Sequence, residues 1–487
     1  AVDGREAAGL QVLSPPPRIR SIIVRVNPGP LYRFGEARVG PLPAGTAPPE
    51  AFRPGRPAST DAIRDAGTQA IDAWRAQGHA KADIAQQRIT AQHAQDRINA
   101  RLAIAPGPRL RFGQVGIAGN EDVRSRRIRT IAGLRPGPVY DPKEIARAET
   151  RLRRTGAFSA VTVSEAEDIG PNDSLPLTIE VVEATPRRFG FGAEYSTIEG
   201  VRLSGFWLHR NFLGGAERFR VDGDVAGLGG ETGGIDYSFG ARYERPATPR
   251  ADIDLFAELQ FEALDEPDYS ADTLEFTLGF TRYATDHLTV EFGLGYLYSD
   301  TTDAFGTESY NLLTLPLAAE NDRRDNELDP KDGYYVDLEV TPFAGLSDSP
   351  SGAQVILDSR AYRSTERLTF AGRLQLGALF GPSLQESPPF YRFFSGGGGT
   401  VRGQEYEALS IDVGGNSIGG RSFLGLSGEL RADVTETIQL VGFADWGYVG
   451  AESFPDLTGD SHAGAGIGLR YNTGIGPIRL DLATPIK

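Results

Sequence analysis

The sequence contains neither cysteine nor methionine, and it has only 5 histidines among 487 residues. Without cysteine, a disulfide framework and a thiolate metal site are excluded. No apolar stretch reaches the roughly 18 residues that a transmembrane helix requires, so a membrane-spanning helix is excluded as well. Acidic residues outnumber basic ones, and the net charge of −15 argues against a nucleic-acid partner.

The start of the chain carries no targeting segment. Its first residues, Ala1-Val2-Asp3-Gly4, lack the charged and apolar regions of a signal peptide. The features below indicate an exported protein, so we expect that its signal peptide has been removed.

Alternation of apolar and polar residues dominates the sequence after Thr185. Near the chain end, Ile478, Leu480 and Leu482 share one face of a predicted strand, and Arg479 and Asp481 share the other. Charges on an inner face would destabilise the core of a soluble β-sandwich, which is the alternative fold. They are expected in the wet lumen of a membrane barrel, so we predict a transmembrane antiparallel β-barrel.

The barrel region contains about fifteen segments with this alternation. The predicted strands lie near 187–196, 199–210, 216–227, 232–245, 251–263, 270–283, 286–299, 306–319, 334–344, 352–363, 367–379, 422–432, 436–447, 462–472 and 475–484. Bacterial single-chain barrels close with an even number of strands, so we expect sixteen, the last lying beyond the given sequence. An open sheet edge in lipid would leave backbone groups without partners.

The first part of the chain contains an internal repeat. The segment Pro-Gly-Pro that begins at Pro28 recurs at Pro106, 78 residues later, and both copies lead into Arg-Phe-Gly. A repeat of this length indicates small modules strung in a row. The earlier copy is predicted as strand 32–39, helix 60–77 and strands 81–89 and 96–104. The later copy is predicted as strand 111–118, helices 121–133 (capped by Asn120) and 142–155, and strands 159–163 and 177–182.

This pattern divides the chain into four predicted domains. Residues 1–30 are predicted as the tail of a first module, with a strand over 18–26. Residues 31–108 and 109–185 are predicted as two complete β-α-α-β-β modules, and 186–487 as the barrel.

One connection, 381–421, is much longer than the others, and long loops are usually functional or disordered. It contains four consecutive glycines, Gly396 to Gly399, followed by Arg402. About forty residues later, Asp445 lies in a predicted strand whose phase points it into the lumen. An Arg402–Asp445 pair would hold the loop inside the barrel through charge-assisted hydrogen bonds. A surface loop with an unpaired arginine is the alternative.

Two motifs in these segments resemble the signatures of the outer-membrane-protein assembly superfamily, which includes BamA and TamA. They are Val401-Arg402-Gly403 and the strand motif formed by Phe443, Asp445 and Gly447. The turn at 325–334, rich in Asp and Asn before a Pro and a Gly, resembles another segment of the family. The β-α-α-β-β repeats resemble its periplasmic POTRA domains, so the likeness covers essentially the whole chain.

The loop motif departs from the family at one position. Members often carry an aromatic residue directly after Arg-Gly, whereas this chain has Gln404 there and Tyr406 two residues later. This departure concerns the packing of the loop tip rather than the role of Arg402.

The number of POTRA modules distinguishes the members of the superfamily. BamA-like proteins have five modules, TamA-like proteins three, and two-partner secretion transporters two behind a plug helix. Two modules and the tail of a third resemble a TamA-like protein. A BamA-like chain truncated at its N-terminus and a secretion transporter are the alternatives.

The resemblance implies an outer-membrane protein of a Gram-negative bacterium that inserts client barrels, including autotransporters, through a lateral gate between the first and last strands. Arg188, Gly190 and Gly192 lie in that first strand, and glycine weakens strand pairing. Relief of crowding at a barrel bend is the alternative role of these glycines. The implied partners are client proteins, outer-membrane lipid or lipopolysaccharide, and a TamB-like inner-membrane protein bound by the N-terminal POTRA.

An outer-membrane enzyme is a further class that the sequence disfavours. Its five histidines are His79, His93, His209, His287 and His462. None lies in a nucleophile motif or at metal-ligand spacing, and no Gly-Lys-Ser/Thr follows Gly399 to make a phosphate loop. We expect no catalytic residue, metal or cofactor.

Overall fold

The computed structural model describes residues 29–196, 200–230, 233–473 and 476–486. Its backbone is grouped into two compact units. One unit contains the first module together with 111–116, 135–146 and 164–178 of the second module, and the other contains the remainder of the second module and the barrel. The predicted tail over 1–30, with its strand at 18–26, lies almost entirely outside the described residues.

The first module is a three-stranded sheet with one helix packed on it, so the predicted order with two helices is wrong here, because residues 41–59 form turns and irregular structure in place of the first helix. Its elements are β1 (Arg33–Gly40), α2 (Thr60–Arg75), β2 (Asp83–Gln92), η1 (His93–Gln95) and β3 (Arg97–Ala105), with the sheet order β1-β3-β2. Ser59 begins α2 by accepting a hydrogen bond from the backbone N–H of Ala62, as an N-cap does. Phe34, Phe52 and Leu102 form the centre of its apolar core.

The second module has the predicted β-α-α-β-β order. Its elements are β4 (Arg111–Ala118), α3 (Ser125–Ala132), α4 (Pro142–Arg154), β5 (Phe158–Glu165), η2 (Pro171–Asp173) and β6 (Ser174–Glu183), with the sheet order β4-β6-β5. The first helix is shorter than predicted, because Asn120 does not cap it. The Asn120 side-chain amide donates to the Val123 carbonyl oxygen instead, and Arg124 occupies the N-cap position.

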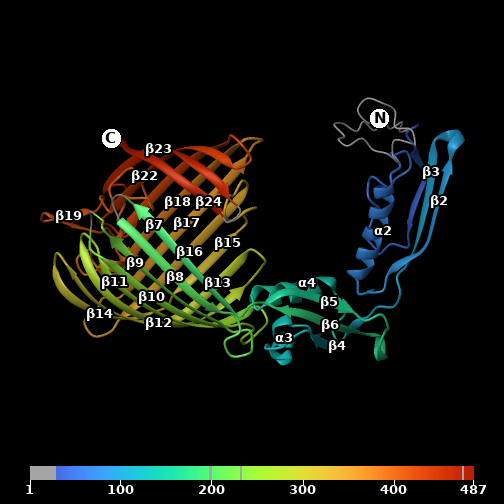
Figure 1. Cartoon of the computed structure of the whole chain (residues 1–487), viewed down its shortest axis with the longest axis horizontal. Helices are drawn as coiled ribbons and strands as arrows, with labels where there is room; N and C mark the ends of the chain where they lie inside the picture. Colours follow the sequence, from blue (N-terminus) through green and yellow to red (C-terminus); the bar gives the residue numbers. More distant parts are fainter. Residues whose placement is uncertain (1–28, 197–199, 231–232, 474–475, 487) are drawn as a thin grey trace, which may run out of the picture. The chain divides into compact units, whose positions relative to one another are not determined.

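All fifteen predicted barrel segments form strands of one antiparallel sheet (Figure 1). The strands are β7 (Arg187–Ser196), β8 (Gly200–His209), β9 (Arg218–Leu228), β10 (Asp236–Arg245), β11 (Ile253–Asp265), β12 (Tyr269–Tyr283), β13 (Leu288–Asp303), β14 (Gly306–Thr314), β15 (Leu317–Asp322), β16 (Gly333–Gly345), β17 (Gly352–Ser364), β18 (Leu368–Phe380), β21 (Ser422–Asp433), β22 (Ile438–Gly450), β23 (Asp460–Thr473) and β24 (Gly476–Ile486).

The sheet has sixteen strands because the segment predicted at 306–319 is two strands, β14 and β15. They are separated by Leu315 and Pro316. Proline has no N–H to donate to the ladder, so it interrupts the strand, although its carbonyl still accepts a hydrogen bond from the Gly293 amide. β14 and β15 both pair with β13 and with β16 on either side of this break.

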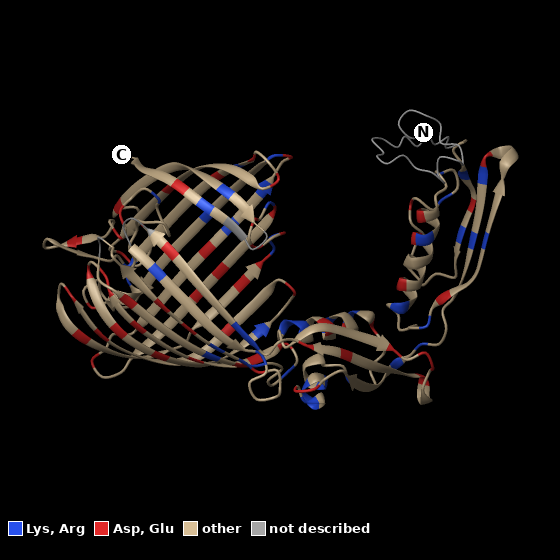
Figure 2. Cartoon of the chain, viewed as in Figure 1, with Lys and Arg blue, Asp and Glu red and all other residues tan. Residues whose placement is uncertain are grey.

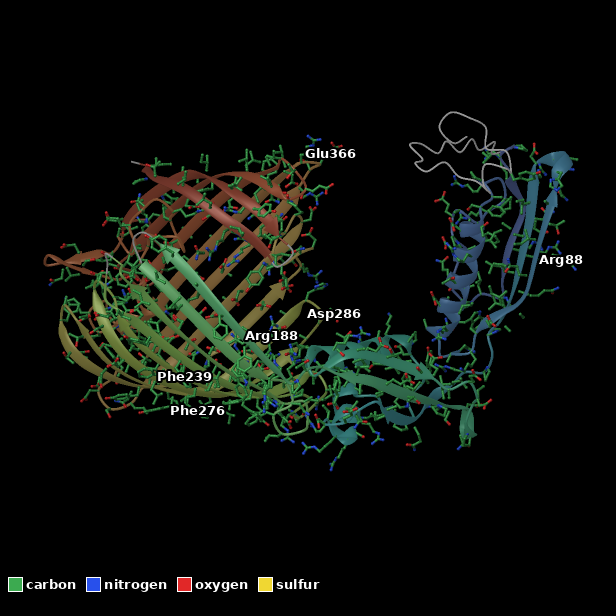
Figure 3. All side chains as sticks on the ribbon, viewed as in Figure 1. Arg88, Arg188, Phe239, Phe276, Asp286 and Glu366 are labelled. Carbon is green, nitrogen blue, oxygen red and sulfur yellow. The ribbon has the colours of Figure 1, made fainter. Side chains whose placement is uncertain are left out.

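The two faces of the barrel wall differ in chemistry, as the alternation predicts. Phe239 and Phe276 project from the outer face (Figure 3), where about half of each side chain is exposed. Charged side chains recur along the strands (Figure 2) and pair across the inner face, for example Arg242 with Glu258 at 2.7 Å. An apolar exterior around a charged, wet interior is the pattern of a membrane barrel.

No pairing between β7 and β24 is present among the described residues, so each of these strands has one neighbour there. None of the helices in the described part of the chain combines the length and apolar character that crossing a membrane requires.

Candidate functional site

The long connection between β18 and β21 folds back into the barrel lumen. It contains η3 (Pro389–Tyr391) and a two-stranded hairpin of β19 (Ile411–Val413) and β20 (Asn416–Ile418). Two parts of it contact the lumen wall. We refer to residues 389–393 as the loop base and to residues 401–406 as the loop tip.

The loop tip is held by the pair that the strand phase predicted. Arg402 donates from Nε to Asp445 Oδ2 at 2.7 Å and from Nη2 to Oδ1 at 2.8 Å, which is a bidentate arrangement. The backbone N–H of Arg402 also donates to Asp445, at 3.2 Å. The Asp445 side chain is 1% exposed, so this carboxylate depends on the loop for its counter-charge. The alternative of an unpaired surface arginine is wrong.

Two further carboxylates and an aromatic ring complete the surroundings of Arg402. Its Nη1 donates to Glu429 at 2.8 Å and to Asp481 at 3.3 Å, from β21 and β24 respectively. The guanidinium carbon lies 3.6 Å from the centre of the Phe443 ring, a cation–π contact. Phe443 and Asp445 therefore contact the same side chain. In the sequence they are linked only by lying two residues apart on one strand, so that both point inward.

Two arginines of the wall share the same carboxylates. Arg431 contacts Glu429 at 2.8 Å, and Arg470 forms an ion pair with Asp481. With Arg402, three guanidinium groups thus share three carboxylates, and Arg479 of β24 adds a further positive charge close to Arg470 and Arg431. Alternation along strands 422–432 and 475–484 puts Glu429, Arg431 and Asp481 on the inner face, but one sequence does not show that they meet, because it does not reveal the register between strands.

Glycines in the wall make room for the loop tip. A Cβ at Gly464 of β23 would overlap the carbonyl oxygen of Arg402, and a Cβ at Gly447 would lie 2.8 Å from a Val401 methyl group. Gly403 has a φ of +93°, which favours glycine, and a Cβ there would lie 2.8 Å from the backbone of Thr484 in β24. We refer to Gly447 and Gly464 as the wall notch.

Polar contacts fix the residues on either side of Arg402. Gln404, which replaces the expected aromatic, donates from its amide to the Ala463 carbonyl oxygen at 2.6 Å. Tyr406 donates from its hydroxyl to Glu266 at 3.2 Å, near the end of β11. The loop tip therefore spans from the β22–β24 side of the lumen toward β11.

The loop base is held mainly by apolar packing, which the sequence did not indicate. Tyr391 packs in a buried cluster on the lumen wall, and its ring centre lies 5.0 Å from that of Phe343. The wall residues of the cluster are Leu297, Tyr310, Leu312, Phe343 and Leu379, with Phe390 and Phe393 of the loop packed against them. These wall residues share the inward phase of their strands, which was the available signal.

One buried ion pair accompanies this cluster. Arg392 of the loop donates to Asp303 at the end of β13 at 2.9 Å, and the two side chains are 2% and 8% exposed. The Arg392 guanidinium also donates to the Ser387 carbonyl oxygen at 2.6 Å.

The strand predicted to weaken the gate, β7, places its named residues on the lumen side. The Arg188 guanidinium lies 5.7 Å from the centre of the Phe206 ring on β8. A Cβ at Gly190 would overlap that ring, and one at Gly192 would contact the Ser204 hydroxyl. Both glycines thus accommodate side chains of β8, and Arg188 is marked in Figure 3.

The histidines occupy scattered positions. His462 contacts the Ser395 hydroxyl at 2.9 Å and His287 contacts the Asp322 carbonyl oxygen at 3.1 Å. In the part of the chain that the structure describes, no group of three or more His, Asp or Glu side chains is placed to hold a metal ion.

Comparison with known proteins gives family matches for both parts of the chain. The Omp85 superfamily domain matches residues 211–487, more than half of the chain. A POTRA domain, described as a surface antigen variable number repeat, matches residues 110–184.

A curated relative is the outer membrane protein assembly factor BamA of Nitratidesulfovibrio vulgaris. It is 23% identical over 411 residues, which are 80% of this chain and 50% of that protein. The chain therefore spans about half the length of this relative.

Two solved structures share the fold. BamA of Haemophilus ducreyi lacking POTRA domains 1–3 matches with a TM-score of 0.73 and 17% identity, covering 94% of this chain and 97% of that one. CdiB of Acinetobacter baumannii matches with a TM-score of 0.56 and 14% identity, covering 95% and 88%. Together with the barrel and the POTRA match, the superfamily domain shows that this chain belongs to the Omp85 superfamily of BamA and TamA, as an outer-membrane barrel with periplasmic POTRA modules.

Proposed function

We propose that this chain is a TamA-like assembly factor that helps insert or secrete β-barrel and autotransporter proteins through a lateral gate between its first and last strands. Its clients are unfolded outer-membrane proteins, and its role is non-enzymatic. The proposed partners also include outer-membrane lipid or lipopolysaccharide and a TamB-like inner-membrane protein that binds the N-terminal POTRA.

The observation that carries the proposal is the contact between the loop tip and the edge strand β24. Arg402 donates to Asp481, and Gly403 packs on the backbone of Thr484. The loop occupies the lumen beside this strand, so a client strand has better access to a sheet edge than to the lumen. Edge strands present unpaired N–H and C=O groups, which is the chemistry that β-augmentation uses.

Strand β7 supports the same proposal from the other side. Gly190 and Gly192 have no side chains with which to pack against a further strand, so pairing along this edge would be weak. The two glycines also make room for Phe206 and Ser204 of β8 on the lumen face, which favours their alternative role in relieving crowding and does not depend on the gate.

The test is insertion of a urea-unfolded β-barrel client into liposomes that contain the purified protein. We expect the wild type to accelerate the appearance of heat-modifiable, folded client. The chain has no native cysteine, so a cysteine on β7 and one on β24 would form the only disulfide. Oxidation should stop insertion and reduction should restore it. Insertion that continues while the strands are tethered would contradict the lateral gate.

A secretion transporter is a second candidate, because the structural match extends to CdiB over 95% of this chain. This function would route a client through the lumen, so it requires that the loop leave its site. Channel conductance in planar bilayers distinguishes the two. We expect small conductance from the wild type, and a large, steady conductance would favour the transporter.

A further inference from the structure

The turn between β15 and β16 lies at the periplasmic end of the barrel. β7 starts at this end, directly after the second POTRA module, and the passes of the sheet alternate in direction, with β14 and β15 forming a single pass. Figure 3 marks Asp286 and Glu366, which lie in two other turns at the same end. We refer to residues 323–332 as the periplasmic strap.

Side chains of the strap hold its backbone in one conformation. Asp325 Oδ1 accepts the backbone N–H of Lys331 at 2.9 Å, and Asn326 Oδ1 accepts that of Asp329 at 3.1 Å. Asp and Asn side chains that accept from nearby backbone groups in this way order a turn. The Asp329 carboxylate is therefore presented from a fixed backbone.

The strap contacts strands that are far from it in the sheet. Asp329 accepts a hydrogen bond from the side-chain amide of Gln439 on β22 and another from that of Asn472 on β23, each at 3.0 Å. Lys331 donates to Asp433 at the end of β21, at 2.8 Å. Three strands, β17, β18 and β21, lie between β16 and β22 in the sheet order. The strap therefore spans these three strands to reach β22 and β23.

The partners of the strap face the lumen. Gln439 lies six residues before Asp445 on β22, and Asn472 lies two residues after Arg470 on β23, so each shares the inward phase of that residue. Asp445 and Arg470 both belong to the charge cluster around Arg402. The strap thus crosses the periplasmic mouth of the lumen, inside the barrel wall.

The strap and the loop tip hold the same three strands at two heights. The loop tip contacts β22, β23 and β24. The strap contacts β22 and β23 through Asp329, and it contacts β24 through the Leu328 carbonyl oxygen, which accepts a long hydrogen bond of 3.4 Å from Arg479. On β22 the two contacts, Gln439 and Asp445, are six residues apart, which is about 20 Å along a strand.

We propose that the periplasmic strap is a latch that holds the ends of β22, β23 and β24 in the resting position, with Asp329 as its positioning residue. In the part of the sheet that the structure describes, β24 pairs with β23 alone, so lumen contacts add to the restraint of this edge. The Asp329 side chain is 24% exposed, so water can replace its two amide donors and the latch can open reversibly. The role of the latch in insertion rests on the proposed lateral gate, whereas the restraint itself does not.

Hydrogen–deuterium exchange of the full chain in nanodiscs tests the latch without any client. Asp329→Ala should speed exchange of the backbone amides that pair β22, β23 and β24 about fivefold or more, because the carboxylate loses both amide donors. The amides of β10, β11 and β12 should keep their wild-type rates. The matched control is Glu366→Ala, which removes an exposed charge from the β17–β18 turn and should change neither region.

Two results of this measurement would overturn the proposal. Unchanged exchange in β22, β23 and β24 would show that Asp329 does not restrain them. An equal increase in every strand would show that Asp329 only stabilises the fold.

A reversible tether between the strap and β23 provides a second test. Asp329→Cys with Asn472→Cys introduces the only two cysteines of the chain, and a short bismethanethiosulfonate reagent can bridge them. The unbridged protein should exchange as fast as Asp329→Ala, since its latch contact is lost. Bridging should return the exchange of β22, β23 and β24 to the wild-type rate or below, and reduction should reverse this effect. Fast exchange that persists in the bridged protein would overturn the latch.

Client insertion by the same tethered protein separates the latch from the lateral gate. We expect bridging to slow insertion about tenfold or more and reduction to restore it, because a held edge cannot part. If the bridged protein protects its β22, β23 and β24 amides and still inserts clients at the unbridged rate, the latch stands and the lateral gate is contradicted. If bridging leaves exchange unchanged, the latch is contradicted whatever the insertion rate.

Discussion

The two ends of the lumen loop are attached to the barrel wall by different chemistry. The loop base inserts Phe390, Tyr391 and Phe393 into an apolar cluster and adds one nearly inaccessible ion pair, Arg392–Asp303. The loop tip has one arginine shared among three carboxylates, and its side chain is 17% exposed. Apolar packing holds the base whatever the charges nearby, whereas the tip depends on the pairing of one arginine with a buried carboxylate, Asp445.

This contrast suggests that the two parts of the loop have different roles. The base lies against β13, β14, β16 and β18, in the middle of the sheet and away from its two end strands. The tip lies against β22, β23 and β24, next to the edge that would open in a lateral gate. A loop anchored firmly at the base could release its tip without leaving the lumen.

The largest expected effect is on activity, and it comes from loss of the Arg402–Asp445 pair, which we call the tip anchor. Arg402→Ala leaves Asp445 buried without its counter-charge, at a cost of about 3–5 kcal/mol, and should reduce client insertion at least tenfold, to roughly background. Asp445→Ala should behave alike, and the barrel should still insert into membranes. The measurement is client insertion in liposomes, with heat-modifiability of the barrel as the folding control.

A charge swap sharpens this result. Arg402→Asp combined with Asp445→Arg should recover part of the activity if direct pairing matters. Wild-type activity in either alanine variant would remove the tip anchor from the mechanism.

The second effect is on stability, and it comes from loss of the Arg392–Asp303 pair at the loop base, which we call the base anchor. Arg392→Ala leaves Asp303 buried without its counter-charge, although the Phe305 N–H still donates to it, and should lower the free energy of unfolding by about 3–5 kcal/mol. We expect a lower temperature of heat-modifiability, with insertion per folded molecule nearly unchanged. The companion variant Arg392→Ala with Asp303→Ala should regain stability, because no charge is left buried.

The assignment of stability to the loop base and of activity to the loop tip would be contradicted by the opposite result. If Arg392→Ala abolished insertion without altering stability, the base would be part of the moving element rather than a fixed support.

A smaller effect is expected from filling the wall notch without changing any charge. Gly464→Ala would place a Cβ against the Arg402 carbonyl oxygen and displace the tip, at a cost of about 1–3 kcal/mol. Insertion should fall several-fold while the Arg402 and Asp445 side chains remain. Gly442→Ala is the matched control, because a Cβ there meets nothing within 4 Å. Equal activity in the two variants would show that the tip tolerates displacement.

The smallest effect is expected at Gln404, where the family often has an aromatic residue. Gln404→Ala removes one hydrogen bond to the Ala463 carbonyl oxygen, a loss of about 0.5–1.5 kcal/mol. Insertion should fall less than threefold, and limited proteolysis of the loop should be slightly faster. A loss as large as that of Arg402→Ala would make Gln404 a principal contact.

Strand positions were predictable because each barrel strand shows its own alternation of outward and inward residues. In β22, for example, Leu440 points outward and Asp445 points inward. The break at Pro316 was not recognised, although proline inside a predicted strand was a visible warning. Asn120 was predicted to cap a helix, but the chain continues through Val123 before α3 begins, and tertiary contacts decide that start.

The residues of the candidate site could be predicted only where the alternation within a single strand determines which way a side chain points. That Asp445 faces inward follows from its own segment, and the family motif named Arg402 as its partner. Glu429 and Asp481 face inward by the same rule, but their meeting with Arg402 depends on the register of β21 through β24. The base cluster joins residues from four strands and the loop, so no local pattern reveals it.

The wall notch has a consequence for exchanging parts between related barrels. Gly464 makes room for the loop backbone at Arg402, and Gly447 makes room for the side chains of Ser395 and Val401, so the loop and this part of the wall fit only each other. A chimera that receives this loop but has larger residues than glycine at these two wall positions would lack the space that the loop occupies. Grafts between such proteins should therefore carry strands β22 and β23 together with the loop.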